Sequence, residues 1–412
     1  MSKSKFFSGQ PIFNQLLSFI PTTLIDKVCR ETNADYYYKH FKAFDHLVTM
    51  LFSSFHQCTS LRELHTGLLA NQHRLHHLGI KHTPRRSTIS DANRTRPVAF
   101  FEKLYHRLYN HHYQAFSPDS RKRKSLVDRL FIVDSTTVSL FSNVMKGAGV
   151  IRMDGRKKGG IKAHVLMTAK TELPSFTILT EAAKNDRIIM PQLELLPGSI
   201  IAMDRAYVNY KLMKEWTEKE ITWVTRVTKS MKIKLLTRNR LKILHKRKGI
   251  LKDWVIQLGN PLTEEKTPVQ TARVISIYDR NTKKKIHLLT NNFTYTPTTI
   301  RKLYQKRWAI EMLFKRIKQN SQLNNFLGEN KNAISIQLWC TLIKDLLTKI
   351  VKDKLTEKGS KKWSFSNLTG FLRLHLYTYI HLMNFLAEPE YALLQHNKGP
   401  DQINLQLKLF SF

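Results

Sequence analysis

The sequence has few cysteines, few acidic residues and no long apolar run. Its 412 residues include three cysteines, Cys29, Cys58 and Cys340, which lie far apart and form no CxxC pair. Their number and spacing exclude a disulfide framework and a cysteine zinc site, and are typical of a reducing compartment. No apolar run approaches the ~18 residues of a membrane-spanning helix, so we expect no membrane partner.

The shortage of acidic residues leaves a large positive charge. Lys and Arg number 68 against 31 Asp and Glu, so the net charge is +37 with histidine neutral. Such self-repulsion destabilises a compact chain, and a polyanionic partner explains it best, with DNA or RNA ahead of a membrane surface. A lysine-rich proteome is the alternative, but the surplus is uneven. Residues 131–225 carry +3, whereas 1–130, 226–300 and 301–412 carry +11, +13 and +10. We therefore expect a chemical core between nucleic-acid-binding flanks, in a cytoplasmic protein associated with the nucleoid.

Hydrophobic periodicity predicts a helical N-terminus, a stranded centre and a helical C-terminus. Apolar residues recur at helical spacing through residues 10–80. The central order of strands and helices describes a mixed α/β sheet with helices packed on it. The strands are predicted at 130–133, 161–168, 174–179, 199–203 and 221–225, and the helices near 188–195 and 211–219.

The later part of the chain predicts an all-β insertion followed by a long helix. Residues 226–292 are β-branched and strongly basic, with strands expected at 254–256, 272–277 and 286–290. The long helix starts with Thr296 as N-cap and Pro297 at its first position. We expect five regions, which are a helical N-terminal DNA-binding domain (1–120), the first part of the sheet core (126–225), the insertion (226–292), the last catalytic helix (293–330) and a helical C-terminal region (331–412).

Two aspartates are expected at the ends of apolar strands. Asp134 follows Phe131-Ile132-Val133, and Asp204 follows Ile200-Ile201-Ala202-Met203. A carboxylate in such a place is costly unless it is paired or binds a metal. For either aspartate alone, an ordinary turn or N-cap residue is the simpler interpretation.

A polar stripe on the long helix favours a catalytic interpretation. Tyr304, Arg307, Glu311 and Lys318 are spaced to fall within an arc of about 60° of one helix face. A salt-bridged stripe in solvent is the alternative, but apolar residues surround it. Three carboxylates from two strands and a helix suit two Mg²⁺ ions, for which Mn²⁺ can substitute, and in-line phosphoryl displacement. Tyr304, Arg307 and Lys318 would hold phosphates beside them.

Further DNA contacts are expected in two basic segments. A short helix starting near Ser87 and ending before Pro97 would carry Arg94 and Arg96, with Arg85 and Arg86 just ahead of it. With the preceding helix it is helix-turn-helix-like, although a solvated basic face is an equal alternative. The second segment is a glycine turn whose lysines would line a DNA path or form an ordinary basic hairpin; they are Lys157, Lys158 and Lys162. Trp254 could stack on a flipped base, but a buried sheet tryptophan is the preferred interpretation.

These residues resemble a known family. The spacing Tyr304-x2-Arg307-x3-Glu311-x6-Lys318, with Asp134-Ser135-Thr136 and Asp204-Arg205-Ala206-Tyr207, is similar to DDE transposases of the insertion-sequence-four group. The family usually has glycine where this chain has Ala206, and many members have His-Asp where it has Asn185-Asp186.

The resemblance implies a ribonuclease H-like core and cut-and-paste movement of an insertion sequence, with strand cleavage through a hairpin and strand transfer. It implies double-stranded DNA as partner, both terminal inverted repeats and target, and a homodimer on paired ends. The alternatives are a catalytically silent DNA-binding protein derived from a transposase and an RNA-processing nuclease. Intact Asp134, Asp204 and Glu311 favour the active enzyme.

Overall fold

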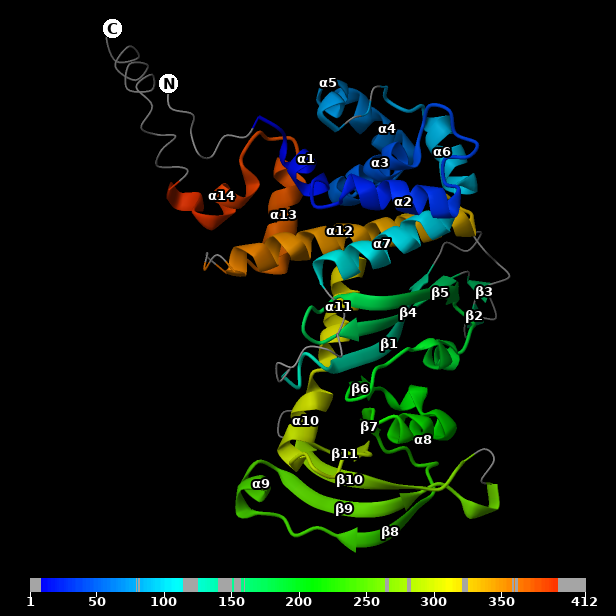
Figure 1. Ribbon diagram of the computed structural model, residues 1–412, viewed down its shortest axis with the longest axis vertical. Coiled ribbons are helices and arrows are strands. Elements are labelled where there is room, and N and C mark those ends of the chain that lie inside the picture. The colour runs from blue at the N-terminus through cyan, green and yellow to red at the C-terminus, as the bar shows by residue number, and fades with distance from the viewer. Residues whose placement is uncertain are drawn as a thin grey trace. The chain divides into compact units, whose positions relative to one another are not determined.

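The computed structural model describes residues 9–78, 80, 82–113, 125–139, 150–151, 157–158, 160–263, 267–279, 283–320, 325–357, 359 and 362–391. The chain divides into two compact units (Figure 1), one of Met1–His112 with Ile317–Phe412, and one of Tyr113–Arg316. Within the described residues, no helix combines the length and the apolar character needed to span a bilayer. Residues 392–412, at the end of the predicted C-terminal region, lie outside the described residues.

The first unit is helical and is built around one long buried helix from the C-terminal part of the chain. That helix, α12 (Lys331–Glu357), packs against α3, α6 and α7, and Figure 1 shows α7 alongside it. Ile334, Ile343 and Leu346 are fully buried on it, as expected for a helix that is apolar on most sides. The other helices are α1 (Ile12–Leu17), α2 (Thr22–Thr32), α3 (Ala43–His56), α4 (Leu61–Ala70), α5 (Gln72–Leu75), α6 (Arg86–Thr95), α7 (Val98–His112), α13 (Phe365–His375) and α14 (Leu382–Ala387).

The N-terminal helices therefore share their core with α12 and do not close one of their own. The expected helix-turn-helix arrangement is also different in the structure. A short helix, α5, and a 3-10 turn at His76–Leu78 separate α4 from α6, so no short turn joins the two helices. They nevertheless contact each other.

The second unit is organised by a nine-stranded mixed sheet in the order β5-β4-β1-β6-β7-β11-β10-β9-β8. β1 pairs antiparallel with β4 and parallel with β6, and β6 pairs parallel with β7. The predicted mixed α/β sheet with helical flanks is confirmed. The strands are β1 (Leu130–Ser139), β4 (Gly160–Thr168), β5 (Pro174–Glu181), β6 (Ile200–Met203), β7 (Thr222–Arg226), β8 (Ile233–Arg238), β9 (Ile250–Leu258), β10 (Gln270–Asp279) and β11 (Lys284–Thr290), with β2 (Val150–Ile151) and β3 (Lys157–Lys158) in a separate ribbon.

The connections of the sheet correct one expectation and confirm another. The helix expected near 188–195 is a 3-10 helix at Asp186–Gln192 that contains Pro191. The helix expected at 211–219 is α8 (Tyr210–Glu218), whose N-cap Asn209 accepts a hydrogen bond from the backbone of Leu212. Pro191 removes a backbone donor and restricts the residue before it. This accounts for a short 3-10 helix at Asp186–Gln192 in place of the expected helix.

The β-rich insertion continues the core sheet. β11 pairs antiparallel with β7, with Leu289 opposite Thr225, and β10, β9 and β8 follow outward. The insertion also contains β8, which the sequence did not predict, and the short helix α9 (Ile243–Arg247), so it is not all-β. Sheet pairing with β7 gives the insertion's last strand backbone partners that a separate module would lack.

The long helix predicted after Thr296 is two helices. Thr296 caps α10 (Pro297–Gln305) by accepting from the backbone of Thr299 at 3.2 Å, as predicted. α10 packs on β6, β7 and β9, and α11 (Trp308–Asn320) follows it. At the junction the backbone of Arg307 donates to the Tyr304 carbonyl at 3.0 Å, which is the tighter bonding of a 3-10 turn. Tyr304 and Arg307 therefore do not share one continuous helical face with Glu311.

Candidate active site

Asp134 and Asp204 lie on neighbouring parallel strands at the same level. β1 and β6 pair with Val133 opposite Met203, so the aspartates are the next residues of each strand. Asp204 directly follows β6 and accepts from the backbone of Ala206 at 3.3 Å. Asp134 is not at a strand end as predicted, because β1 continues to Ser139. Residues at matching positions of parallel strands point to the same face, so the two carboxylates approach each other.

Arg307 joins the first aspartate to Glu311. Its Nη1 donates to Asp134 Oδ2 at 3.3 Å, and its Nη2 donates to Glu311 Oε1. The guanidinium is buried, and it lies between two groups of opposite charge. The sequence distance from Asp134 to Arg307 is 173 residues. Two of the three predicted carboxylates, Asp134 and Glu311, thus share one arginine.

The electrostatics of Asp134 reflect this crowding. Burial raises the pKa of Asp134 to about 6. The backbone N–H of Ser135 and the Arg307 guanidinium oppose the rise, while the charges of Asp204 and Glu311 add to it. A bound cation would relieve the same repulsion among the carboxylates.

The donor set fits a hard divalent cation by its chemistry. Asp134, Asp204 and Glu311 offer carboxylate oxygens, which Mg²⁺ takes as ligands. In the described part of the chain, however, no three His, Cys, Asp or Glu side chains are gathered closely enough to hold an ion. The Arg307 guanidinium stands where it neutralises two of the three carboxylates. Those residues could hold a metal once Glu311 exchanges this partner.

Tyr304 is buried beside two arginines, and only 6% of its surface is exposed. Its ring lies 5.3 Å from the guanidinium carbon of Arg226 and 5.9 Å from that of Arg307. Burial raises the pKa of the Tyr304 phenol, and both arginines lower it. Arg226, at the end of β7, is a site residue that sequence reasoning missed, because nothing local distinguishes it. Lys318 is exposed on the last turn of α11, seven residues after Glu311.

Asp186 forms a second polar cluster next to Asp134. Ser135 Oγ donates to Asp186 Oδ1 at 2.6 Å, and Lys162 Nζ lies 3.1 Å from the same oxygen. Lys162 also donates to the carbonyl of Lys184 at 2.8 Å. Burial favours a higher pKa for Asp186, but the hydrogen bonds from Ser135 and Lys162 hold its pKa below the usual value. The predicted DNA contact Lys162 is therefore engaged with Asp186 in this structure.

The other candidates of this unit are placed as follows. Lys157 and Lys158 form β3 of the small ribbon, and their side chains lie outside the described part of the structure. Trp254 is half-buried on β9, so the preferred interpretation of a buried tryptophan holds only in part. Lys252 Nζ is 4.3 Å from its ring, and the guanidinium carbon of Arg238 is 5.7 Å away.

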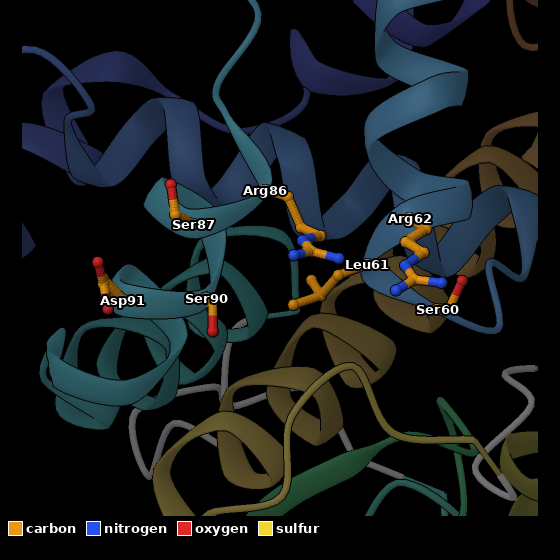
Figure 2. A pocket seen from close by; sticks show the side chains of 7 residues that line it. All are labelled: Ser60, Leu61, Arg62, Arg86, Ser87, Ser90 and Asp91. Atoms are coloured by element: carbon orange, nitrogen blue, oxygen red, sulfur yellow. The ribbon is translucent and has the colours of Figure 1, made fainter.

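The helical unit presents its own basic cleft of about 700 Å³ between α4 and α6. Figure 2 shows Arg86 and Arg62 on this cleft, with Leu61 between them, and Ser60, Ser87, Ser90 and Asp91 around them. Arg62 was not predicted, because it stands in an otherwise unremarkable helix. Arg85 is exposed at the N-cap of α6, and Arg94 is exposed but pairs with Asp91 at 3.3 Å.

Arg96 is not a surface residue as expected. It is fully buried and donates to the backbone carbonyls of Ala34, Phe41 and Lys42 at 3.2, 2.6 and 3.0 Å. The Tyr38 ring lies 3.9 Å from its guanidinium carbon. Arg96 therefore holds the segment between α2 and α3 and is unavailable to DNA.

Comparison with known proteins gives two family matches. Residues 125–343, just over half of the chain, match the family described as Transposase DDE domain. Residues 8–81 match a domain of unknown function (DUF4372). The first match includes Asp134, Asp204 and Glu311.

Two relatives, by sequence, agree with the first match. A protein named as transposase y4zB of Sinorhizobium fredii is 29% identical over 273 residues, which is 65% of this chain and 72% of that protein. A protein named as the transposase for insertion sequence element IS5377 of Geobacillus stearothermophilus is 27% identical over 57% of this chain and 60% of its own length. A solved structure of the piggyBac transposase synaptic complex with hairpin DNA aligns with 94% of this chain and 81% of that chain, at 10% identity and a TM-score of 0.44.

Proposed function

We propose a function for this chain on the premise that it belongs to the Transposase DDE domain family. The chain is an insertion-sequence transposase that cuts DNA at the ends of its element and joins the freed ends to a target. The observation that carries this proposal is the cluster in which Arg307 links Asp134 to Glu311, with Asp204 on the neighbouring parallel strand. Clustered carboxylates on a basic protein suit metal-assisted phosphoryl transfer on DNA.

The finer assignment is to the insertion-sequence-four group, with a ribonuclease H-like core and cut-and-paste movement. The spacing from Tyr304 to Lys318 supports the group. The core order β5-β4-β1-β6-β7, three antiparallel strands followed by two parallel ones, supports the core. We expect a cytoplasmic protein associated with the nucleoid.

In the proposed mechanism, Asp134, Asp204 and Glu311 would hold two Mg²⁺ ions, or Mn²⁺ in their place. The chemistry that such ions would supply is activation of water and stabilisation of the leaving oxygen in an in-line displacement. Before a metal binds, Arg307 keeps Glu311 turned towards Asp134, and the backbone N–H of Ser135 orients Asp134 Oδ1 at 2.9 Å. Tyr304, Arg307 and Lys318 hold the phosphates next to the cut.

The proposed DNA partners are the terminal inverted repeats and the target, bound by a homodimer on paired ends. Arg85, Arg86 and Arg94 on the helical unit contact the element's ends, and the cleft that Arg62 and Arg86 line supports this. Lys157, Lys158 and Lys162 are proposed to line the path to the active site. Because most of the surplus charge lies outside residues 131–225, affinity should fall steeply with salt.

The metal site is tested by Asp204→Asn. The variant should still bind a duplex of the inverted repeat read from the DNA flanking the reading frame, but its end cleavage in Mg²⁺ should fall by a factor on the order of 10³, as loss of a metal ligand removes several kcal/mol of transition-state stabilisation. Asp128→Asn is the matched control, because Asp128 is a surface partner of Lys170 in the same unit. Wild-type cleavage by Asp204→Asn would refute the assignment.

The hairpin route is tested by Arg307→Ala. One active site must cut two strands of opposite polarity, and the freed 3′-hydroxyl can itself attack the opposite strand. That step needs a sharply bent strand and clamped phosphates, for which an arginine gives both energy and geometry. Arg307→Ala should impair hairpin formation more than first-strand nicking, seen as loss of the double-length strand on a denaturing gel. Flush ends with no trapped hairpin in any variant would contradict this route.

The competing proposal is a catalytically silent DNA-binding protein derived from a transposase. The intact trio of Asp134, Asp204 and Glu311 favours the enzyme. End-specific binding without cleavage by the wild-type protein in either Mg²⁺ or Mn²⁺ would favour the silent protein.

A further inference from the structure

A second basic cleft is lined by Arg205, the residue that follows Asp204 in the chain. It measures about 500 Å³ and is lined by the start of α8, the turn between β6 and α8, and the loop after β7; Figure 1 places α8 between β6 and β7 in the chain. The lining residues that matter here are Arg187, Arg205, Tyr210, Lys211, Thr228 and Ser230. None of the described lining residues is acidic, and three of them, Arg187, Arg205 and Lys211, are cationic.

The three cationic side chains of the cleft differ in their existing hydrogen bonds. Arg187 Nε donates to the carbonyl of Ala206 at 3.1 Å, which fixes this guanidinium against the segment that follows Asp204. Within the described part of the chain, the side chains of Arg205 and Lys211 form neither a hydrogen bond nor an ion pair, and both are exposed. Their donors are therefore available to a ligand.

The neutral walls of the cleft complete an anion-binding surface. The hydroxyls of Thr228 and Ser230 hydrogen-bond to each other at 3.0 Å on the loop after β7, which leaves one hydroxyl proton of the pair for a ligand. Lys211 stands in the first turn of α8, where the helix dipole favours an anion. The exposed cations contrast with the enclosed, mostly apolar walls of a small-molecule site.

We propose that this cleft holds backbone phosphates of the DNA strand next to the phosphate being cut. The proposal rests on the proposed function, because Arg205 directly follows the metal-site residue Asp204 in the chain. Phosphates along one strand recur at about 3.4 Å of helix axis, so a strand cut at Asp204 carries its next phosphates past Arg205. The ligand class is thus the phosphodiester backbone, which the cleft recognises without reading sequence.

The test neutralises the protein and the DNA separately. End duplexes carry a single uncharged methylphosphonate at successive positions around the cut, and binding is measured in Ca²⁺ by fluorescence anisotropy, so that cleavage does not contribute. A methylphosphonate at one or two of these positions should weaken DNA binding by the wild type by a factor on the order of 10. Arg205→Ala or Lys211→Ala should remove that sensitivity. Lys211→Ala should also reduce the slope of log affinity against log salt by about 0.9.

Lys219→Ala is the matched control, because Lys219 is an exposed lysine at the opposite end of α8. It should keep the sensitivity of the wild type at every position. If Arg205→Ala and Lys211→Ala both keep the full methylphosphonate profile, the proposal is overturned. Cleavage in Mg²⁺ is measured separately. If Arg205→Ala and Lys211→Ala remove the methylphosphonate sensitivity but the wild type never cleaves, the catalytic function is refuted and the phosphate site is supported.

Discussion

The two units bury arginine in different ways. In the helical unit, Arg96 is fully buried and its hydrogen-bond acceptors are backbone carbonyls of the segment between α2 and α3. In the sheet unit, Arg273 is 5% exposed and forms a two-fold contact with Asp253, at 2.8 and 2.7 Å. The first arginine organises a loop through neutral partners, whereas the second is matched by a charge.

The difference has a structural reason in each unit. Arg273 also donates to the carbonyl of Tyr295 at 2.7 Å, in the turn just before the N-cap Thr296 of α10. The Asp253–Arg273 pair thus ties the insertion strands to the start of the helix pair that carries Arg307 and Glu311. A buried ion pair can fix geometry where it adds little net stability, and here it joins β9 and β10 to the turn before α10.

Of the variants that test the two buried arginines, Asp253→Asn should lower the unfolding free energy most. The change leaves the buried Arg273 charge without its counter-charge, and breaking such a pair typically costs about 3–5 kcal/mol of unfolding free energy. The measurement is chemical denaturation, with end cleavage followed on the protein that remains folded. The double variant Asp253→Leu, Arg273→Met removes both charges and should recover much of the stability but not the cleavage. Full stability of Asp253→Asn would show that the pair is not buried in solution.

A smaller loss is expected from Arg96→Met. Three carbonyls lose their donor, and a buried unsatisfied acceptor costs about 1–3 kcal/mol, partly offset where water reaches the loop. We expect a loss of about 2–3 kcal/mol, measured by denaturation. Below the unfolding transition, end binding should equal that of the wild type, because the side chain does not reach the surface. Weaker end binding by the folded variant would show that Arg96 contributes to DNA binding after all.

The smallest effect, counted per unit of pH, concerns the titration of His46 in the same part of the helical unit. His46 is fully buried and bonds to Asn93 at 2.8 Å; burial, with the nearby Arg96 charge, lowers its pKa to about 3. Below pH ~6.5 the unfolded chain protonates this histidine and the folded chain does not, so each pH unit down to about 3 should cost about 1.4 kcal/mol. Above that pH the group is neutral in both states and contributes nothing.

His46→Gln tests this dependence, because glutamine keeps a donor for Asn93 and does not titrate. The difference in unfolding free energy between variant and wild type should be flat above pH ~6.5 and should change in favour of the variant as the pH falls. Parallel curves across the whole acid range would show that His46 protonates without unfolding the helices.

The sequence by itself determined the local features of this protein. The apolar strand cores, the charge surplus and the Thr296–Pro297 start of α10 depend on neighbouring residues, so spacing and residue type were enough to predict them. The same local signals are enough to propose Asp134, Asp204 and Glu311 as candidate site residues. The neighbouring positions of Asp134 and Asp204 agree with the predicted sheet, because the two residues follow opposite positions of paired parallel strands.

Only the tertiary structure decided how distant segments use these parts. Arg307 reaches Asp134 across 173 residues, α12 supplies the core of the N-terminal helices, and the insertion joins the sheet at β7. The same basic pattern that predicted surface arginines contains the buried Arg96, since burial depends on the carbonyls of a loop more than fifty residues earlier. Local spacing cannot encode such contacts, because the partners that stabilise them are brought near only when the chain has folded.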